Sequence, residues 1–378
     1  MRAFWVSFVL ILQWLTPLYA CFAQTPLPTN PPATQEATQR KPGEFLIPTE
    51  EHTHISTNII VPQMAQNKKV QDPHPIMPDA VLVETKVGDK NIQVFHHVNS
   101  SYRETHPIFS PDGQTLFFAR SHSPDNIGGH DDPQDIYFST RHTDGSWTTP
   151  ENMKELNNSS SNGVTSISTD GNSLLVINSY KRGFGSSSDV AVVRKTPEGK
   201  WGKPEGLYIN NYYNYSEYAD FIWTPDGKAL IMALHRKDSI GGMDLYVSYI
   251  LSDGDWSEPQ NLGVNVNSTK DEFAPYLSSD GQTLYFSSEG HKGYGQADVF
   301  RVHRLSDTNW TEWSKAENLG SHINSAKWEA YFTVANTGNI CYVRSTSAEQ
   351  RDSDLIHIVF SPQELESVIR DANTSWNH

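Results

Sequence analysis

The sequence predicts an all-β protein whose main body is a single β-propeller of five blades. The first observation is a glycine-containing turn that recurs with spacings of 58, 56, 54 and 57 residues, at Gly113, Gly171, Gly227, Gly281 and Gly338. The second is an aspartate that opens a β-rich run with spacings of 54, 55, 54 and 56 residues, at Asp135, Asp189, Asp244, Asp298 and Asp354. Because two independent markers keep one period, the chain is a tandem repeat.

Each repeat unit reads as four short strands. In the fourth unit a short run over 274–278 precedes the Asp280-Gly281 turn, and an apolar run over 283–287 follows it. Glycine supplies the positive φ that such a turn requires. A Gly-rich loop then leads to a third run, and a segment that carries Trp and Pro ends most units. Four antiparallel strands per unit are typical of a propeller blade.

The ends of the repeat region predict that the propeller closes with an N-terminal strand. The fifth unit has its third run at 354–360 but no Trp-Pro segment, and residues 79–99 resemble that missing part. Val98-Asn99 matches Val266-Asn267, so the propeller is expected over 79–362. Six blades is the alternative, if 79–99 forms a degenerate unit of its own.

The first 78 residues predict export followed by a tether. Residues 1–23 have a basic start, an apolar core and small residues near the end, as a signal peptide does. Residues 24–78 are rich in Pro, Thr and Gln and read as a flexible tether. We therefore expect a periplasmic or envelope-associated protein without a transmembrane span in the mature chain. Lipidation at Cys21, giving an outer-membrane lipoprotein, is the alternative, and 363–378 is expected to be a C-terminal tail.

Composition excludes two classes of protein. The 44 acidic residues outnumber 29 basic ones, which disfavours binding to the phosphates of nucleic acid. With only two cysteines, neither a disulfide framework nor a Cys-based zinc site is expected. Cys341 takes a strand position that other units fill with leucine, which predicts a buried, unreactive thiol.

Two stretches resemble a known family. Residues 271–288, which read DEFAPYLSSDGQTLYFSS, and the Gly241–Tyr246 motif followed by 253–263 resemble the TolB-type WD-repeat-like propellers of bacterial cell-envelope proteins. The second unit departs from the pattern with three serines at 186–188, and the fifth lacks Asp-Gly. The resemblance implies an envelope propeller that serves as a binding or scaffold module.

One candidate ligand site is a ring of side chains at the start of each innermost strand, where the channel would open. Its members are Glu104, Asn162, Tyr218, Glu272 and Glu329. Such a ring could hold a cation, calcium being the one cofactor it would admit, or a basic peptide. The alternative is that each glutamate bonds a neighbouring blade's backbone. No metal ligand is assigned.

A second candidate is the Tyr- and Asn-rich segment 208–215, which contains Tyr212, Tyr213 and Tyr215. Exposed Tyr and Asn suit a protein or glycan surface. A self-packed loop is the alternative.

The predicted function is an exported, non-catalytic binding or scaffold module whose partner is an envelope protein or a cell-wall polymer. The repeated aspartates are interpreted as caps of the loop before the third strand. The sequence has no G-x-S-x-G or H-E-x-x-H motif, and no unit stands out with an added acid, base or nucleophile. No catalytic residue is therefore predicted. The alternative is a glycan-active hydrolase or lyase with its site at the channel mouth.

Overall fold

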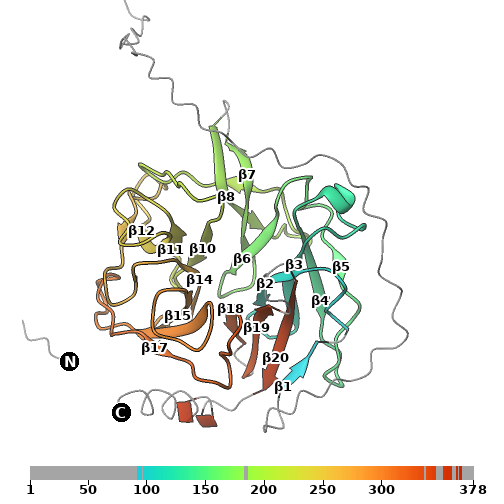
Figure 1. Cartoon of the computed structure of the whole chain (residues 1–378). Coiled ribbons are helices and arrows are strands. Elements are labelled where there is room, and N and C mark those ends of the chain that lie inside the picture. The colour runs from blue at the N-terminus through green and yellow to red at the C-terminus, as the bar shows by residue number, and fades with distance from the viewer. Residues whose placement is uncertain are drawn as a thin grey trace, which may run out of the picture. The chain divides into compact units, whose positions relative to one another are not determined.

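The computed structural model contains five four-stranded antiparallel sheets arranged as the blades of a propeller (Figure 1). It describes residues 92–95, 97–182, 186–335, 338–345, 352–359, 363–364 and 366–367. The expected signal peptide over 1–23 and tether over 24–78 lie outside these residues. The prediction of five blades is confirmed.

Within each of the first four blades the strands follow chain order from the inside outward. The first blade comprises β2 (Glu104–Phe109), β3 (Thr115–Arg120), β4 (Asp135–Thr140) and β5 (Glu151–Asn152). The second comprises β6 (Gly163–Ile167), β7 (Ser173–Arg182), β8 (Ser186–Arg194) and β9 (Glu205–Gly206). The third comprises β10 (Asp220–Trp223), β11 (Ala229–Leu234), β12 (Asp244–Tyr249) and β13 (Gln260–Asn261). The fourth comprises β14 (Glu272–Leu277), β15 (Thr283–Ser288), β16 (Asp298–His303) and β17 (Glu317–Asn318).

The fifth blade combines both ends of the repeat region. It comprises β18 (Glu329–Val334), β19 (Asn339–Ser345), β20 (Ser353–Val359) and, as its outer strand, β1 (Ile92–Val94). The Asn99 side chain adds a clasp, because it accepts a hydrogen bond from the backbone N–H of Leu355 and donates one to its carbonyl, both at 2.9 Å. Asn267 makes the same pair with Leu245, at 2.7 and 3.0 Å. The predicted closure by an N-terminal strand is confirmed.

The repeated aspartates cap loops in the blades where the repeat is regular. Asp244 accepts hydrogen bonds from the backbone N–H groups of Ile240 and Gly241 and from the Asn261 amide. Asp298 is bound in the same way by Tyr294, Gly295 and Asn318. The predicted structural role is confirmed there.

Apolar side chains fill the spaces between neighbouring blades. Leu175 and Val192 of the second blade, for example, pack in one cluster with Phe221 and Tyr246 of the third. Cys341 is fully buried in β19, as predicted, and burial raises the pKa of its thiol well above the usual range. A short 3-10 turn, η1 (Gly129–Asp131), lies between β3 and β4.

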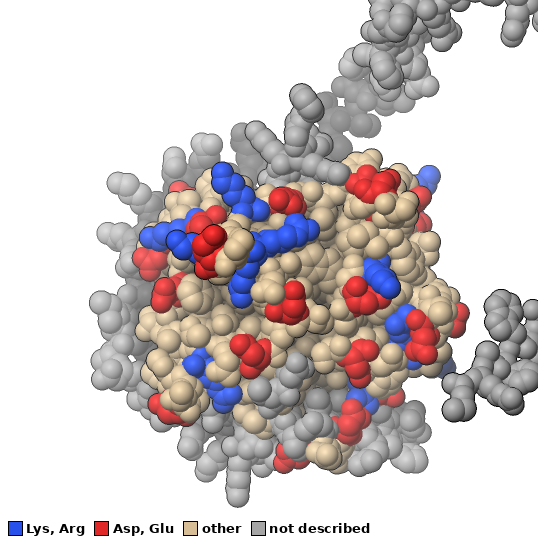
Figure 2. Space-filling model, turned by 180° about the vertical axis from the view of Figure 1, so that it is seen from behind, with Lys and Arg blue, Asp and Glu red and all other residues tan. Residues whose placement is uncertain are grey.

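On the face shown in Figure 2, acidic and basic side chains are interspersed. Of the expected tail over 363–378, Glu366 is described and pairs with Arg301 of β16 at 2.7 Å. Within the described part of the chain, no helix is both long and apolar enough to cross a membrane.

Candidate functional site: the central channel and its mouth

The innermost strands β2, β6, β10, β14 and β18 surround the centre of the propeller, each contacting the next around the ring (Figure 1). Equivalent positions of the five strands therefore form rings around one axis. The starts of these strands gather at one end of the channel, and their last residues at the other end. The two ends differ in chemistry.

Three of the predicted ring members, the glutamates, are buried within the blades. Glu104, Glu272 and Glu329 are each 0% exposed. Glu272 accepts hydrogen bonds from the backbone N–H of Ser268 at 2.7 Å and from the Ser288 hydroxyl at 2.6 Å. Their carboxylates thus tie the preceding turn to the end of the neighbouring strand, which is a structural role.

Glu104 and Glu329 add an ion pair to this arrangement, each at 2.8 Å to the guanidinium of Arg120 or Arg344. Burial nevertheless raises the pKa of Glu104 to about 7, against the lowering effect of Arg120. Burial also raises the pKa of Glu272 to about 7.

The other two ring members differ in their exposure to solvent. Asn162 is fully buried and accepts a hydrogen bond from the backbone N–H of Asn158 at 2.8 Å, whereas Tyr218 is 73% exposed. The five residues therefore do not form one open ring of side chains. Ligand binding by this set stays a prediction.

The Tyr-rich segment is partly packed against the propeller. The Tyr212 hydroxyl donates to Asp189 at 2.9 Å, and the guanidinium of Arg236 lies 4.2 Å from the centre of the Tyr213 ring. Tyr215 is 65% exposed and contacts the rings of Tyr213 and His235. The self-packed alternative accounts for Tyr212 and Tyr213, and binding through Tyr215 stays a prediction.

A polar contact joins His106 of β2 to Asp220 of β10, two of the inner strands. His106 Nε2 lies 3.4 Å from Asp220 Oδ1, and the Tyr331 ring packs 4.1 Å from the imidazole. Asp220 also accepts the backbone N–H of Ala274 at 2.9 Å. Both residues line a void of about 20 Å³.

The expectation that no unit adds an acid or base is therefore wrong. By the repeat spacing, His106 and Asp220 are equivalent positions that Val164, Ala274 and Tyr331 fill in the other blades. The added acid and base were detectable by comparing units at the second position after the ring residue. His106, Ala274 and Tyr331 have positive φ of 52°, 51° and 55°, and they lie at bulges between the first two strands.

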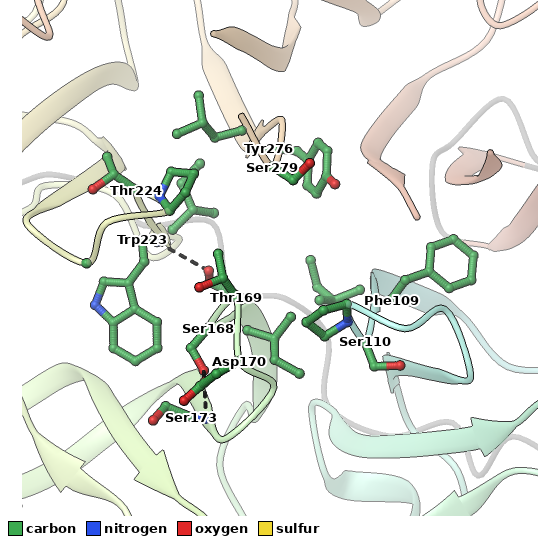
Figure 3. Close-up of a pocket in the computed structure, with 18 of the residues that line it drawn as sticks. Phe109, Ser110, Ser168, Thr169, Asp170, Ser173, Trp223, Thr224, Tyr276 and Ser279 are labelled. Atoms are coloured by element: carbon green, nitrogen blue, oxygen red, sulfur yellow. Dashed lines mark hydrogen bonds between the residues drawn. The ribbon is translucent and has the colours of Figure 1, made fainter. Parts of the chain in front are cut away.

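At the other end, where the inner strands finish, a cavity of about 560 Å³ opens at the channel mouth (Figure 3). All five blades contribute to its wall. Figure 3 shows Ser110, Thr169, Trp223 and Ser279, from four different blades, placed around the opening. We call this space the mouth cavity. The predicted ring residues lie at the opposite end of the inner strands, and the residues of the mouth cavity were not selected from the sequence.

The carboxylates at the mouth cavity are already bound within their own turns. Asp170 accepts hydrogen bonds from the Ser168 hydroxyl and the backbone N–H of Asn172, and these bonds lower its pKa. Asp226 is slightly buried, which opposes ionisation, but bonds from Thr224 and Lys228 leave its pKa lowered. Neither side chain has the raised pKa of a general acid.

Among the described residues, no group of three or more His, Cys, Asp or Glu side chains could hold a metal ion. The Trp223 backbone N–H donates to the Ser166 hydroxyl at 3.2 Å, joining β10 to β6 beside the cavity (Figure 3). The mouth cavity is thus an acidic space, because two carboxylates and no Lys, Arg or His are among the described residues of its wall. It is also rich in hydroxyl groups and has aromatic side chains in its wall.

No family model matches the sequence, and neither does any curated protein. Among solved structures, the chain is similar to TolB from Acinetobacter baumannii, with 16% identity, 70% of this chain and 56% of that chain covered, and a TM-score of 0.38. It is also similar to α-L-arabinofuranosidase from Lactobacillus brevis, with 12% identity, coverage of 72% and 94%, and a TM-score of 0.45. A protein of unknown function from Dyadobacter fermentans has 12% identity, coverage of 71% and 97%, and a TM-score of 0.41. The chain thus spans about half the length of the TolB structure, and likenesses this distant say nothing of a ligand.

Proposed function

We propose that this chain is a non-catalytic binding propeller of the bacterial cell envelope, exported from the cytoplasm, and that its ligand occupies the mouth cavity. The partner is an envelope protein or a cell-wall polymer. The observation that carries the proposal is the mouth cavity itself. A volume of about 560 Å³ lies within the range of small-ligand sites, about 300–1,000 Å³.

The carboxylates argue for binding rather than hydrolysis. A glycosidase needs two carboxyl groups with different environments, one of which stays protonated to act as the acid. Asp170 and Asp226 both have lowered pKa values, so both are ionised at neutral pH. Glu104 and Glu272 have pKa values raised to about 7, but their side chains are buried at the opposite end of the inner strands.

The test fills the mouth cavity with a large side chain. Ser279 is an exposed turn residue in the cavity wall, and Ser252 is an exposed turn residue outside it. The purified full chain, Ser279→Trp and the control Ser252→Trp are incubated with envelope extract and with a panel of glycans. We expect bound material that Ser279→Trp loses and Ser252→Trp keeps, without cleavage of any glycan. Turnover, or binding that both variants retain, would contradict the proposal.

A further inference from the structure

The loop over 121–134, which joins β3 to β4 in the first blade, covers two buried carboxylates. Asp132 is 1% exposed and Asp135 is 0% exposed. Consecutive backbone N–H groups hold them side by side: that of Ile127 donates to Oδ2 of Asp135, and that of Gly128 donates to Oδ2 of Asp132, both at 2.8 Å. The Oδ1 atom of each carboxylate is buried and has no hydrogen-bond partner among the described residues. Such an oxygen is destabilising unless a counter-charge lies against it.

In the regular blades the equivalent aspartate has no unpaired oxygen of this kind. In the third blade the backbone N–H of Gly241 donates to Oδ1 of Asp244 at 3.2 Å, and the fourth blade has the same bond at 3.0 Å. In the first blade Asp132 takes the place of that glycine, and its own N–H donates to the carbonyl of Gly129. Asp135 therefore lacks the usual donor for its Oδ1 and has a second carboxylate beside it.

Among the described residues, no basic side chain forms an ion pair with either carboxylate. Arg120 is the partner of Asp135 across β3 and β4, but its guanidinium pairs with Glu104 at 2.8 Å. The loop over 121–134 contains two further aspartates and no Lys or Arg. Burial raises the pKa of Asp135, and the negative charge of Asp132 raises it further. The pair thus lacks a counter-charge from the protein.

We propose that Asp132 and Asp135 bind a calcium ion through their Oδ1 atoms, and that this ion fixes the loop over 121–134 to the first blade. Calcium accepts carboxylate, carbonyl and water oxygens in variable geometry, so backbone carbonyls of the loop and water would complete its ligands. A divalent ion neutralises both carboxylates, whereas a proton shared between them would neutralise only one. The backbone donors on the two Oδ2 atoms also favour the ionised form of each carboxyl group. The site shares no residue with the mouth cavity, so it does not depend on the proposed function.

The test removes one carboxylate and matches the change in charge. The full chain, Asp132→Asn and the control Asp131→Asn are freed of metal with a chelator and titrated with calcium chloride by calorimetry and by thermal unfolding. Asp131 is the exposed neighbour of Asp132, so both variants lose one negative charge from the same loop. We expect the unmodified chain to bind one calcium ion with a Kd below about 1 mM, and its Tm to rise by about 5 °C at saturation. Asp131→Asn should respond in the same way, and Asp132→Asn should bind calcium at least about tenfold more weakly.

Asp132→Gly is a second variant, because glycine is the residue that the third and fourth blades have at this position. It should fold and bind calcium as weakly as Asp132→Asn, and it serves in place of that variant if the asparagine chain does not fold. No calcium binding by the unmodified chain, or equal affinity of the unmodified chain and the folded Asp132 variants, would overturn the inference. A higher Tm of Asp132→Asn, with no response of any chain to calcium, would show that the two carboxyl groups share a proton instead.

Discussion

The two ends of the innermost strands use polar side chains in opposite ways. At their starts, Glu104, Glu272 and Glu329 are fully buried and bound to their own turns and strands. At their ends, the turn aspartates Asp170 and Asp226 are exposed at the mouth cavity and accept hydrogen bonds within their own turns. An acid repeated in several blades therefore serves the structure of the blade.

The largest expected effect comes from the starts of the inner strands. Glu329→Ala should remove about 3 kcal/mol of stability, because it leaves the largely buried guanidinium of Arg344 without its carboxylate. Urea unfolding followed by tryptophan fluorescence measures the loss. In the control Glu205→Ala, the partner Arg194 is 60% exposed, so the loss should stay below about 0.5 kcal/mol. Equal losses in the two variants would mean that the buried glutamate has no special structural role.

The second effect concerns closure of the propeller by its N-terminal strand. Asn99→Ala should cost about 2 kcal/mol, because it leaves the backbone N–H and carbonyl of Leu355 without the clasp. Hydrogen exchange should show the added loss of protection in β20 and β1. Asn267→Ala removes the same two bonds inside the chain, at Leu245, and serves as the comparison. If only Asn267→Ala were destabilising, the N-terminal strand would not close the propeller in solution.

The architecture could be predicted because its signals repeat. The turn glycines and the strand aspartates fixed the number of blades, and the match of Val98-Asn99 to Val266-Asn267 located the closing segment. The clasp made by Asn99 is the physical basis of that match. Such signals are local in the sequence, so they can be recognised without knowledge of tertiary contacts.

The candidate site could not be predicted as well, because the burial of a side chain decides whether it can contact a ligand. The spacing that aligned Glu104 with Glu272 and Glu329 was correct, but spacing does not show whether a carboxylate faces the channel or the preceding turn. The junction after the second blade shows the same difficulty. By the repeat spacing, Tyr213 takes the position at this junction that Asn267 takes at the next one. The clasp made by Asn267 is replaced here by a hydrogen bond from the Tyr212 hydroxyl to Asp189. That substitution of one partner for another is visible only in three dimensions.

The third effect is a dependence of stability on pH at the starts of the inner strands. Burial holds the pKa of Glu272 at about 7 in the folded protein, above its ordinary value of 4.5, so the folded state binds this proton more tightly. The resulting stability is fully present below about pH 4.5 and is lost as the pH rises through about 7. Relative to Glu272→Gln, the unmodified chain should therefore lose about 1–2 kcal/mol between pH 4.5 and 7.5. Denaturant unfolding of both chains across this range measures the difference, and two parallel curves would contradict the raised pKa.

The smallest effect lies at the mouth cavity, and its dependence on pH has the opposite sign. Bonds from the Ser168 hydroxyl and the Asn172 N–H lower the pKa of Asp170, so its contribution is present above the ordinary pKa of 3.8 and is lost as the pH falls through the folded value. Because this side chain is solvated and asparagine can accept the same bonds, Asp170→Asn should cost only about 0.3 kcal/mol at pH 7. The deficit should vanish near pH 2, whereas that of Glu272→Gln should be largest at low pH. Thermal unfolding of both variants at pH 2.5, 4.5 and 7 compares the two ends directly. A deficit of Asp170→Asn that grows toward low pH would mean that the carboxyl is held protonated at the mouth, which is the arrangement a glycosidase acid requires.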